Sequence, residues 1–198
     1  MEKVLPHSLF TDHDIFLFKE GTHYQLYEKF GAHSLEIDGV AGVYFSVWAP
    51  FAKEVSVIGD FNQWHSEAHK LLPRWDESGI WEGFIAGLKW GDVYKYGIRT
   101  NKGAQLEKGD PFALSWEQNL QAGSLVSTTW FEWNDQKWLS ERANKNSLKA
   151  PMSVYEMHLG SWMRGTDDPE KFFSYREIAE RLVPYIKEMG FTHVEFMP

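Results

Sequence analysis

The sequence predicts a mainly β protein, an immunoglobulin-like antiparallel β-sandwich followed by one β-α-β unit. Two observations lead to this fold class. First, short runs of alternating apolar and polar residues fill residues 39–126 and are separated by clusters of Gly, Pro, Asn and Asp, a pattern typical of sandwich strands. Second, the pattern changes at residue 151 to strand, helix and strand, which is typical of parallel pairing. These changes divide the chain into four segments, 1–38, 39–126, 127–150 and 151–198.

Residues 1–38 are expected to form an N-terminal arm. Asp14 stands where a helix cap is expected, ahead of the apolar residues 16–18. Apolar residues recur at near-helical spacing between residues 26 and 30. Since an arm of this size is too small to bury apolar side chains alone, we expect it to dock on the segment that follows.

Residues 39–126 are expected to form the sandwich. The alternation is clearest over residues 43–48, 55–58 and 94–99, where every second side chain would face the same side of a sheet. Turn-forming residues separate these runs, and Asn101-Lys102-Gly103 is typical of a hairpin turn. This regular spacing of short strands and turns favours an antiparallel sandwich.

The rest of the chain divides into a polar segment and a β-α-β unit. Residues 127–150 are polar and weakly periodic, and we expect a linker or an extended crossing segment there. In residues 151–198, one apolar helical face lies between two β-rich runs. Ser174 and Glu177 form a capping box at the expected start of the helix, and Gly190 stands at its expected end. Such a unit buries its strands only within a larger parallel sheet.

Composition excludes several classes of protein. The formal net charge is -8 and the basic residues are scattered, so nucleic acid and anionic membrane surfaces are poor partners. No stretch approaches the roughly 18 apolar residues of a membrane helix, and the first residues lack the apolar run of a signal peptide. Cysteine is absent, which excludes disulfides and thiolate metal sites. We therefore expect a soluble cytoplasmic protein, and its oligomeric state stays open.

Aromatic residues make up 16% of the chain and include 10 Trp. Sugar rings have apolar C–H faces that stack on flat aromatic rings, so the excess of Trp is compatible with carbohydrate binding. Aromatic residues also build protein cores, and composition alone favours that second explanation. Trp48 and Trp81 lie within strand patterns, and we expect both in the core.

One stretch of the predicted sandwich carries a specific motif. Residues 45–64 read FSVWAPFAKEVSVIGDFNQW, in which Gly59, Asp60 and Asn62 are expected to form a turn that projects Trp64 from the sheet edge. This stretch resembles the family 48 carbohydrate-binding module found beside glucan-active catalytic barrels. The resemblance also includes GIWEGFIAGL at 79–88, GDVYKYGI at 91–98 and DPFA at 110–113.

This resemblance implies two sugar-binding residues. In the family, the Trp of the FNxW turn and the Lys of the YKY strand contact glucan, which implies Trp64 and Lys95 here. A second stacking aromatic, expected just after the hairpin turn, is missing, since Ala104 and Gln105 stand there. A purely structural sandwich is therefore an alternative, because a Trp in a tight turn also covers loops.

Both ends of the chain resemble one enzyme family, the 1,4-α-glucan branching enzymes. YEMHLGSWMR at 155–164 is similar to their first barrel strand, and YREIAERLVPYIKEMGFTHVEFMP at 175–198 is similar to the helix and second strand that follow. DIFLFKEGTHYQLYEKFGAH at 14–33 is similar to the segment before their sandwich. The resemblance implies that residues 151–198 are the first β-α-β of an incomplete (β/α)8 barrel. It also implies glycoside hydrolase family 13 chemistry in the parent protein, which transfers an α-1,4-glucan segment to a 6-hydroxyl and forms α-1,6 branches in glycogen biosynthesis.

The chain itself is expected to lack the catalytic residues. Retaining chemistry needs a nucleophilic carboxylate and an acid/base carboxylate about 5 to 5.5 Å apart, and in this family they lie on barrel strands later than the second. Asp167 and Asp168 adjoin Pro169, which is typical of a solvated turn. Glu156 and Glu195 lie within the expected strands, with no residue to close the opposite wall of a site. We assign no catalytic residue, no cofactor and no metal ligand.

Three functional hypotheses follow. The parent protein is a branching transferase whose partner is an α-glucan such as glycogen, or the chain only binds glucan, or the sandwich only positions the barrel. Debranching and trehalose-forming enzymes of the same family are a further alternative, which HLGSW at 158–162 and the arm disfavour. The 198-residue chain alone is expected to be inactive under each hypothesis.

Overall fold

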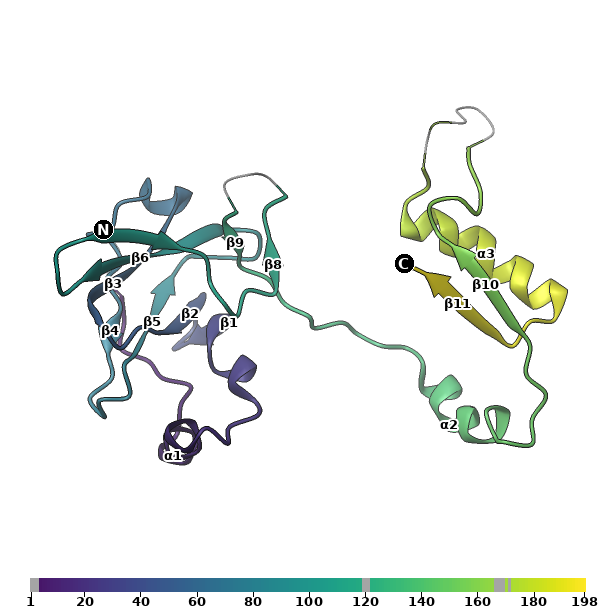
Figure 1. Cartoon of the computed structure of the whole chain (residues 1–198), viewed down its shortest axis with the longest axis horizontal. Helices are drawn as coiled ribbons and strands as arrows, with labels where there is room; N and C mark the ends of the chain where they lie inside the picture. Colours follow the sequence, from purple (N-terminus) through teal and green to yellow (C-terminus); the bar gives the residue numbers. More distant parts are fainter. Residues whose placement is uncertain (1–3, 119–121, 166–169, 171) are drawn as a thin grey trace. The chain divides into compact units, whose positions relative to one another are not determined.

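The computed structural model describes residues 4–118, 122–165, 170 and 172–198, and it contains two compact units, Met1–Phe131 and Glu132–Pro198 (Figure 1). Each unit has a hydrophobic cluster of its own. None of the helices in the described ranges is long and apolar enough to cross a membrane.

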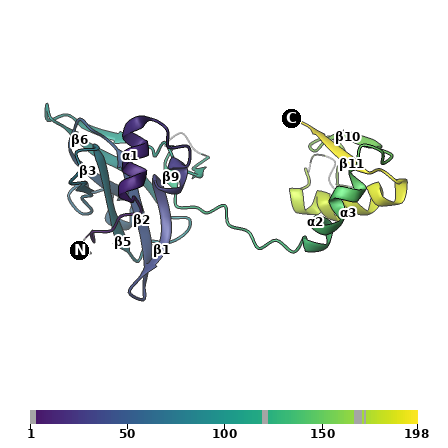
Figure 2. The same ribbon diagram turned by 90° about the horizontal axis from the view of Figure 1, so that it is seen from below.

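The first unit consists of two antiparallel sheets (Figures 1 and 2). One has the order β1-β2-β5-β4, with bounds Gly31–Ile37, Val40–Trp48, Ile80–Ala86 and Leu72–Pro73. The other has the order β3-β6-β9-β8, with bounds Ala52–Gly59, Val93–Thr100, Ser124–Leu125 and Ser115–Trp116, and β7 (Gln105–Lys108) also pairs with β6. The predicted mainly β, antiparallel character is confirmed. The predicted hairpin is also confirmed, since β6 and β7 flank residues 101–104 and Gly103 has a φ of 84°.

The core lies between the two sheets, as the alternation predicts. Val55 and Val57 of β3 belong to one buried cluster with Phe45 of β2 and with Tyr94 and Tyr96 of β6. The ring centroids of Phe45 and Tyr94 lie 5.0 Å apart with edge-on geometry. Each fully buried side chain of this kind contributes about 1.5 to 3 kcal/mol to stability, so this cluster is the main source of stability of the first unit.

A buried carboxylate ties the end of the DPFA motif to this core. Asp110 is fully buried, and its Oδ2 accepts a hydrogen bond of 2.6 Å from the Tyr94 hydroxyl and lies 3.2 Å from the Tyr96 hydroxyl. Its Oδ1 accepts from the backbone N–H of Phe112 at 2.8 Å. The Tyr96 hydroxyl also lies 3.1 Å from the carbonyl oxygen of Ser46 on the opposite sheet. Burial raises the pKa of Asp110, although hydrogen bonds from Tyr94 and Phe112 act in the other direction.

The first sheet begins earlier than expected. The boundary between arm and sandwich was placed at residue 39, yet β1 occupies Gly31–Ile37 and pairs with β2 along its whole length. The alternation over these residues is weak because β1 is an edge strand whose side chains are mostly half-exposed or exposed. The sandwich therefore includes the last part of the segment that was assigned to the arm.

The arm docks on the outer face of the first sheet, as expected. Helix α1 (Asp12–Glu20) lies over this sheet in Figure 2, and η1 (Leu26–Glu28) follows it. Ile15 of α1 is buried in a cluster with Phe10, Phe30 and Ile80 of β5. The cap of α1 is Thr11, and Asp14 is its capping-box partner rather than the cap itself.

Asp14 also links α1 to the part of the arm that follows it. Its carboxylate lies 2.9 Å from His23 Nε2 and 3.2 Å from Lys29 Nζ. Burial acts to raise the pKa of Asp14, but hydrogen bonds from Thr11, His23 and Lys29 outweigh it and hold this pKa well below its usual range. The carboxylate is therefore charged at neutral pH and fixes the loop after α1.

The second unit contains a β-α-β arrangement and one additional helix. Strands β10 (Val154–His158) and β11 (His193–Met197) pair in parallel, and α3 (Tyr175–Met189) connects them. The predicted capping box of Ser174 and Glu177 is present, and Gly190 ends the helix with a φ of 77°. The buried side chains come from β10 and α3 and are Met157, Ile178, Leu182 and Ile186.

The segment expected as a linker is partly helical. Helix α2 (Gln136–Lys145) occupies its middle and has no buried residue and no side-chain cap. Because a helix without a buried face shows no apolar periodicity, the sequence pattern did not indicate it.

Candidate functional site

A tight turn after β3 presents Trp64. Its first part is η2 (Asp60–Asn62), and Asn62 holds it together by accepting a hydrogen bond from Gly59 N at 3.0 Å and donating one to the Val57 carbonyl at 2.9 Å. Trp64 has a φ of 61°, and its indole N–H donates to Asp60 Oδ1 at 2.8 Å. A positive φ is uncommon for a bulky residue, so these hydrogen bonds fix the half-buried indole in one orientation.

Lys95 lies beside this indole. On β6 it stands between Tyr94 and Tyr96, which point into the core, so its own side chain lies on the outer face of the second sheet. Its Nζ lies 5.7 Å from the centroid of the Trp64 ring, within cation–π range. The structure thus brings together the two residues that the resemblance implied.

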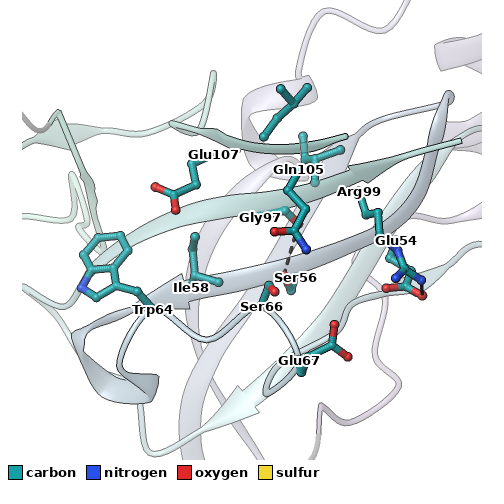
Figure 3. Close-up of a pocket in the computed structure, with 12 residues that line it drawn as sticks. Glu54, Ser56, Ile58, Trp64, Ser66, Glu67, Gly97, Arg99, Gln105 and Glu107 are labelled. Atoms are coloured by element: carbon teal, nitrogen blue, oxygen red, sulfur yellow. Dashed lines mark hydrogen bonds and ion pairs between the residues drawn. The ribbon is translucent and has the colours of Figure 1, made fainter. Parts of the chain in front are cut away.

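A groove of about 320 Å³ runs from Trp64 over the outer face of the second sheet (Figure 3). In Figure 3, Trp64 lies at one end and the Glu54 and Arg99 side chains lie at the other. Ser66 and Glu67 of the loop after Trp64 line one side, and β7 lines the other side. Among the residues that the structure describes, the lining is Glu54, Ser56, Ile58, Trp64, Ser66, Glu67, Gly97, Ile98, Arg99, Gln105, Leu106 and Glu107.

Charges in the groove are largely paired. Arg99 forms an ion pair with Glu54, and Lys70 Nζ lies 3.2 Å from Glu54 and 2.5 Å from Glu67. Burial acts to raise the pKa of Glu54, but hydrogen bonds and charges from Lys70 and Arg99 outweigh it and lower this pKa. Within the described residues, no group of three or more His, Cys, Asp or Glu side chains could hold a metal ion. The groove offers an aromatic surface beside hydrogen-bonding groups, which suits an uncharged polar ligand.

Some lining residues were not predicted. Ser66, Glu67 and Gln105 reach the groove from a loop and from a hairpin that are far apart in the sequence. Their only signal in the sequence was their closeness to the FNxW turn and to the hairpin turn. The prediction of a core position for Trp48 was wrong: the side chain is 57% exposed, and its indole N–H donates to the Ser78 carbonyl at 3.0 Å.

Two of the four carboxylates considered above lie on the parallel strand pair of the second unit. Glu156 and Glu195 are opposite each other in the β10–β11 register, and both are exposed. Asp167 and Asp168 lie outside the described residues.

Comparison with known sequences identifies relatives of the chain. Residues 29–113 match the family model of carbohydrate-binding module 48, the isoamylase N-terminal domain. The chain is 48% identical over 192 residues to the 1,4-α-glucan branching enzyme GlgB of Gloeobacter violaceus, and the aligned residues cover 96% of the chain and 26% of the relative. It is 49% identical over 198 residues to GlgB of Aromatoleum aromaticum, and the aligned residues cover 100% of the chain and 30% of the relative. The chain thus spans less than a third of the length of these relatives.

Solved structures share the fold at lower identity. The apo pullulanase of Klebsiella pneumoniae superposes with a TM-score of 0.53 at 22% identity, over 86% of this chain and 20% of the other. The pullulanase SAP of Group B Streptococcus in complex with maltotetraose gives a TM-score of 0.51 at 19% identity, over 88% of this chain and 24% of the other. At these identities the likeness extends to the fold alone.

Proposed function

We propose, from the premise that residues 29–113 belong to carbohydrate-binding module family 48, that the chain is the N-terminal part of a 1,4-α-glucan branching enzyme. Its relatives named for this activity are 48% and 49% identical across nearly the whole chain. The parent protein would transfer an α-1,4-glucan segment to a 6-hydroxyl, with the catalytic carboxylates outside these residues.

The first unit would bind α-glucan in the groove at Trp64. The observation that carries this proposal is the 5.7 Å approach of Lys95 Nζ to the Trp64 ring at the end of a polar groove. The indole would stack on the apolar face of a glucose ring, and Lys95 would donate to its hydroxyls. Maltotetraose is bound by one of the structurally similar pullulanases, which supports an α-1,4-linked ligand.

The second unit would be the first β-α-β of an incomplete (β/α)8 barrel. Parallel pairing of β10 with β11 and burial of β10 against α3 support this assignment. Barrel catalysis draws residues from several strands, so the 198-residue chain is expected to show no branching activity. An assay of the loss of iodine absorbance by amylose checks this, and turnover by the purified chain would contradict the assignment.

Replacing Trp64 by alanine is expected to weaken glycogen binding by the 198-residue chain about tenfold, because one stacking platform is worth about 1 to 3 kcal/mol. Affinity electrophoresis in gels that contain glycogen measures the dissociation constant. Trp90→Ala is the matched control, because Trp90 is 69% exposed but does not line the groove.

If the sandwich only positions the barrel, the same gels are expected to show no glycogen binding. The absence of an aromatic residue at positions 104 and 105 favours this second candidate. Under it, the wild-type chain and both variants would migrate at one mobility whatever the glycogen concentration, and that result would contradict glucan binding.

A further inference from the structure

We propose that Trp75 forms a second α-glucan-binding site, separate from the groove at Trp64. The site is a cavity of about 510 Å³ between the arm and β4, lined in part by His7, Ser8 and Asp12 and by Pro73, Arg74 and Trp75. The choice of α-glucan as the ligand rests on the proposed function, whereas the existence of the site rests on the geometry of this cavity.

The Trp75 side chain is an exposed platform in a fixed segment. It is 81% exposed, whereas the side chains of its two neighbours, Arg74 and Asp76, are only 6% and 8% accessible and form an ion pair of 2.8 Å. The backbone carbonyl of Asp76 also accepts a hydrogen bond of 2.7 Å from Lys19 Nζ of α1. Since the backbone is anchored on both sides of Trp75, little backbone entropy is lost when a ligand stacks on the ring.

The floor of the cavity is a network of charged and polar groups. Arg74 Nη1 lies 2.7 Å from Glu82 Oε1, and Glu82 Oε2 accepts from the Ser8 hydroxyl at 2.9 Å and from the Tyr44 hydroxyl at 2.6 Å. These groups are held in place before any ligand arrives. A cavity lined both by a fixed polar network and by an exposed aromatic ring matches the two kinds of surface on a hexose, namely hydroxyl groups and an apolar face.

Asp12 supplies a hydrogen-bond acceptor for the ligand. It is exposed in the first turn of α1 and lines the cavity. A carboxylate accepts charge-assisted hydrogen bonds from neighbouring hydroxyls of one sugar ring. Asp12 and Glu82 also disfavour a phosphate-bearing ligand such as a nucleotide, because like charges would meet in the cavity. An uncharged polyol therefore suits the site better than an anion.

The two sites would lie on opposite faces of the sandwich. Glu82 and Tyr44 lie on the face of the first sheet that the arm covers, whereas the groove at Trp64 lies on the outer face of the second sheet. One unit could thus hold two separate chains of a branched glucan, and binding at two sites raises the apparent affinity for a multivalent polymer without new contacts.

The test is a fluorine-19 NMR titration of the whole chain labelled with 5-fluorotryptophan, carried out in the Trp64→Ala background. The Trp75 resonance is assigned by its loss in Trp75→Phe. Maltoheptaose is expected to shift this resonance along a saturable curve while the Trp90 resonance stays in place. Asp12→Asn is expected to weaken the apparent affinity read at Trp75 about tenfold, the effect of losing one charge-assisted contact.

Three results would overturn the proposal. The Trp75 resonance could stay unmoved at saturating maltoheptaose, the β-linked cellohexaose could shift it equally well, or Asp12→Asn could leave its curve unchanged. Failure of the proposed function is read separately, at the Trp64 resonance of the otherwise unsubstituted chain. A shift at Trp75 without one at Trp64 supports this site alone.

Discussion

Replacing Asp110 by alanine is expected to lower the free energy of unfolding of the first unit by about 3 to 5 kcal/mol at neutral pH. The substitution leaves two donors without their acceptor, namely the hydroxyl of Tyr94 and the backbone N–H of Phe112, whereas the hydroxyl of Tyr96 keeps the Ser46 carbonyl oxygen within reach. Each buried, unsatisfied donor costs about 1 to 3 kcal/mol, and the costs are not additive. Amide hydrogen exchange of β3 and β6 in the whole chain measures the loss.

Asp110→Asn tests the negative charge of Asp110 separately from its role as a hydrogen-bond acceptor. The amide oxygen can still accept from a tyrosine hydroxyl, but its NH₂ group cannot accept from Phe112, so we expect a loss of about 1 to 3 kcal/mol. The raised pKa of Asp110 means that the folded state binds the proton more tightly than the unfolded state. This stabilising contribution is complete below the unfolded pKa of about 3.9 and is lost as the pH rises through the folded pKa.

The pH dependence gives a second readout of the same variant. The difference in stability between wild type and Asp110→Asn is expected to shift in favour of the wild type as the pH falls toward 3.9 or so. A loss below about 1 kcal/mol in Asp110→Ala would show that the carboxylate does not hold these donors. A difference between wild type and Asp110→Asn that does not change with pH would show that burial does not raise the pKa of Asp110.

Replacing Arg74 by methionine is expected to destabilise the first unit by about 3 to 5 kcal/mol, the usual cost of leaving a buried charge unpaired. The side chains of Glu82 and Asp76 are only 10% and 8% accessible, and both lose their cation in this variant. The guanidinium also lies 5.6 Å from the Phe10 ring, so its loss removes a contact between the arm and the sheet. The same exchange measurement, read at β2 and β5, gives the magnitude.

The double variant Arg74→Met with Glu82→Gln is the control for this prediction. In the double variant only Asp76 loses its cation, whereas the single variant leaves both Asp76 and Glu82 unpaired, so the double variant is expected to recover part of the lost stability. Arg74→Lys keeps the positive charge but cannot pair with Asp76 and Glu82 at the same time through a planar fork, and we expect an intermediate loss. Equal stability of the single and double variants would contradict the role given to the ion pair.

The elements predicted correctly are those specified by short stretches of sequence, such as strand alternation, turns and helix caps. The alternation of residues 94–99 placed β6, and Asn101 to Gly103 placed the hairpin that follows it. Ser174, Glu177 and Gly190 fixed both ends of α3, because caps depend on hydrogen bonds within a few residues.

The elements that were missed lack an apolar face. Edge strand β1 buries little of its side chains, and α2 buries none. Hydrophobic periodicity reports burial rather than backbone conformation, so neither element could be recognised in this way. The error at Trp48 is the opposite one, because a strand was predicted correctly but burial was not. Trp48 is the last residue of β2, and alternation does not show whether a side chain at the end of a strand is covered.

The candidate site was predicted only in part. Trp64 and Lys95 came from a motif resemblance, and the structure places them 5.7 Å apart. The Trp75 cavity has no such signal, because it joins residues of the arm to residues near β4. Contacts between residues so far apart in the chain follow from the docking of the arm, which no local pattern specifies.

Strand β6 contributes both to the core and to the outer surface beside Trp64. The hydroxyls of Tyr94 and Tyr96 hold one side of the strand to Asp110, and Lys95 projects from the other side. A twist of β6 about its own axis would swing the ammonium group off the indole, and the two phenol anchors resist that twist. Substitutions in the interior that leave the sandwich folded are therefore able to shift Lys95 relative to the Trp64 ring, and under the proposed function they would lower glucan affinity without changing a residue of the site.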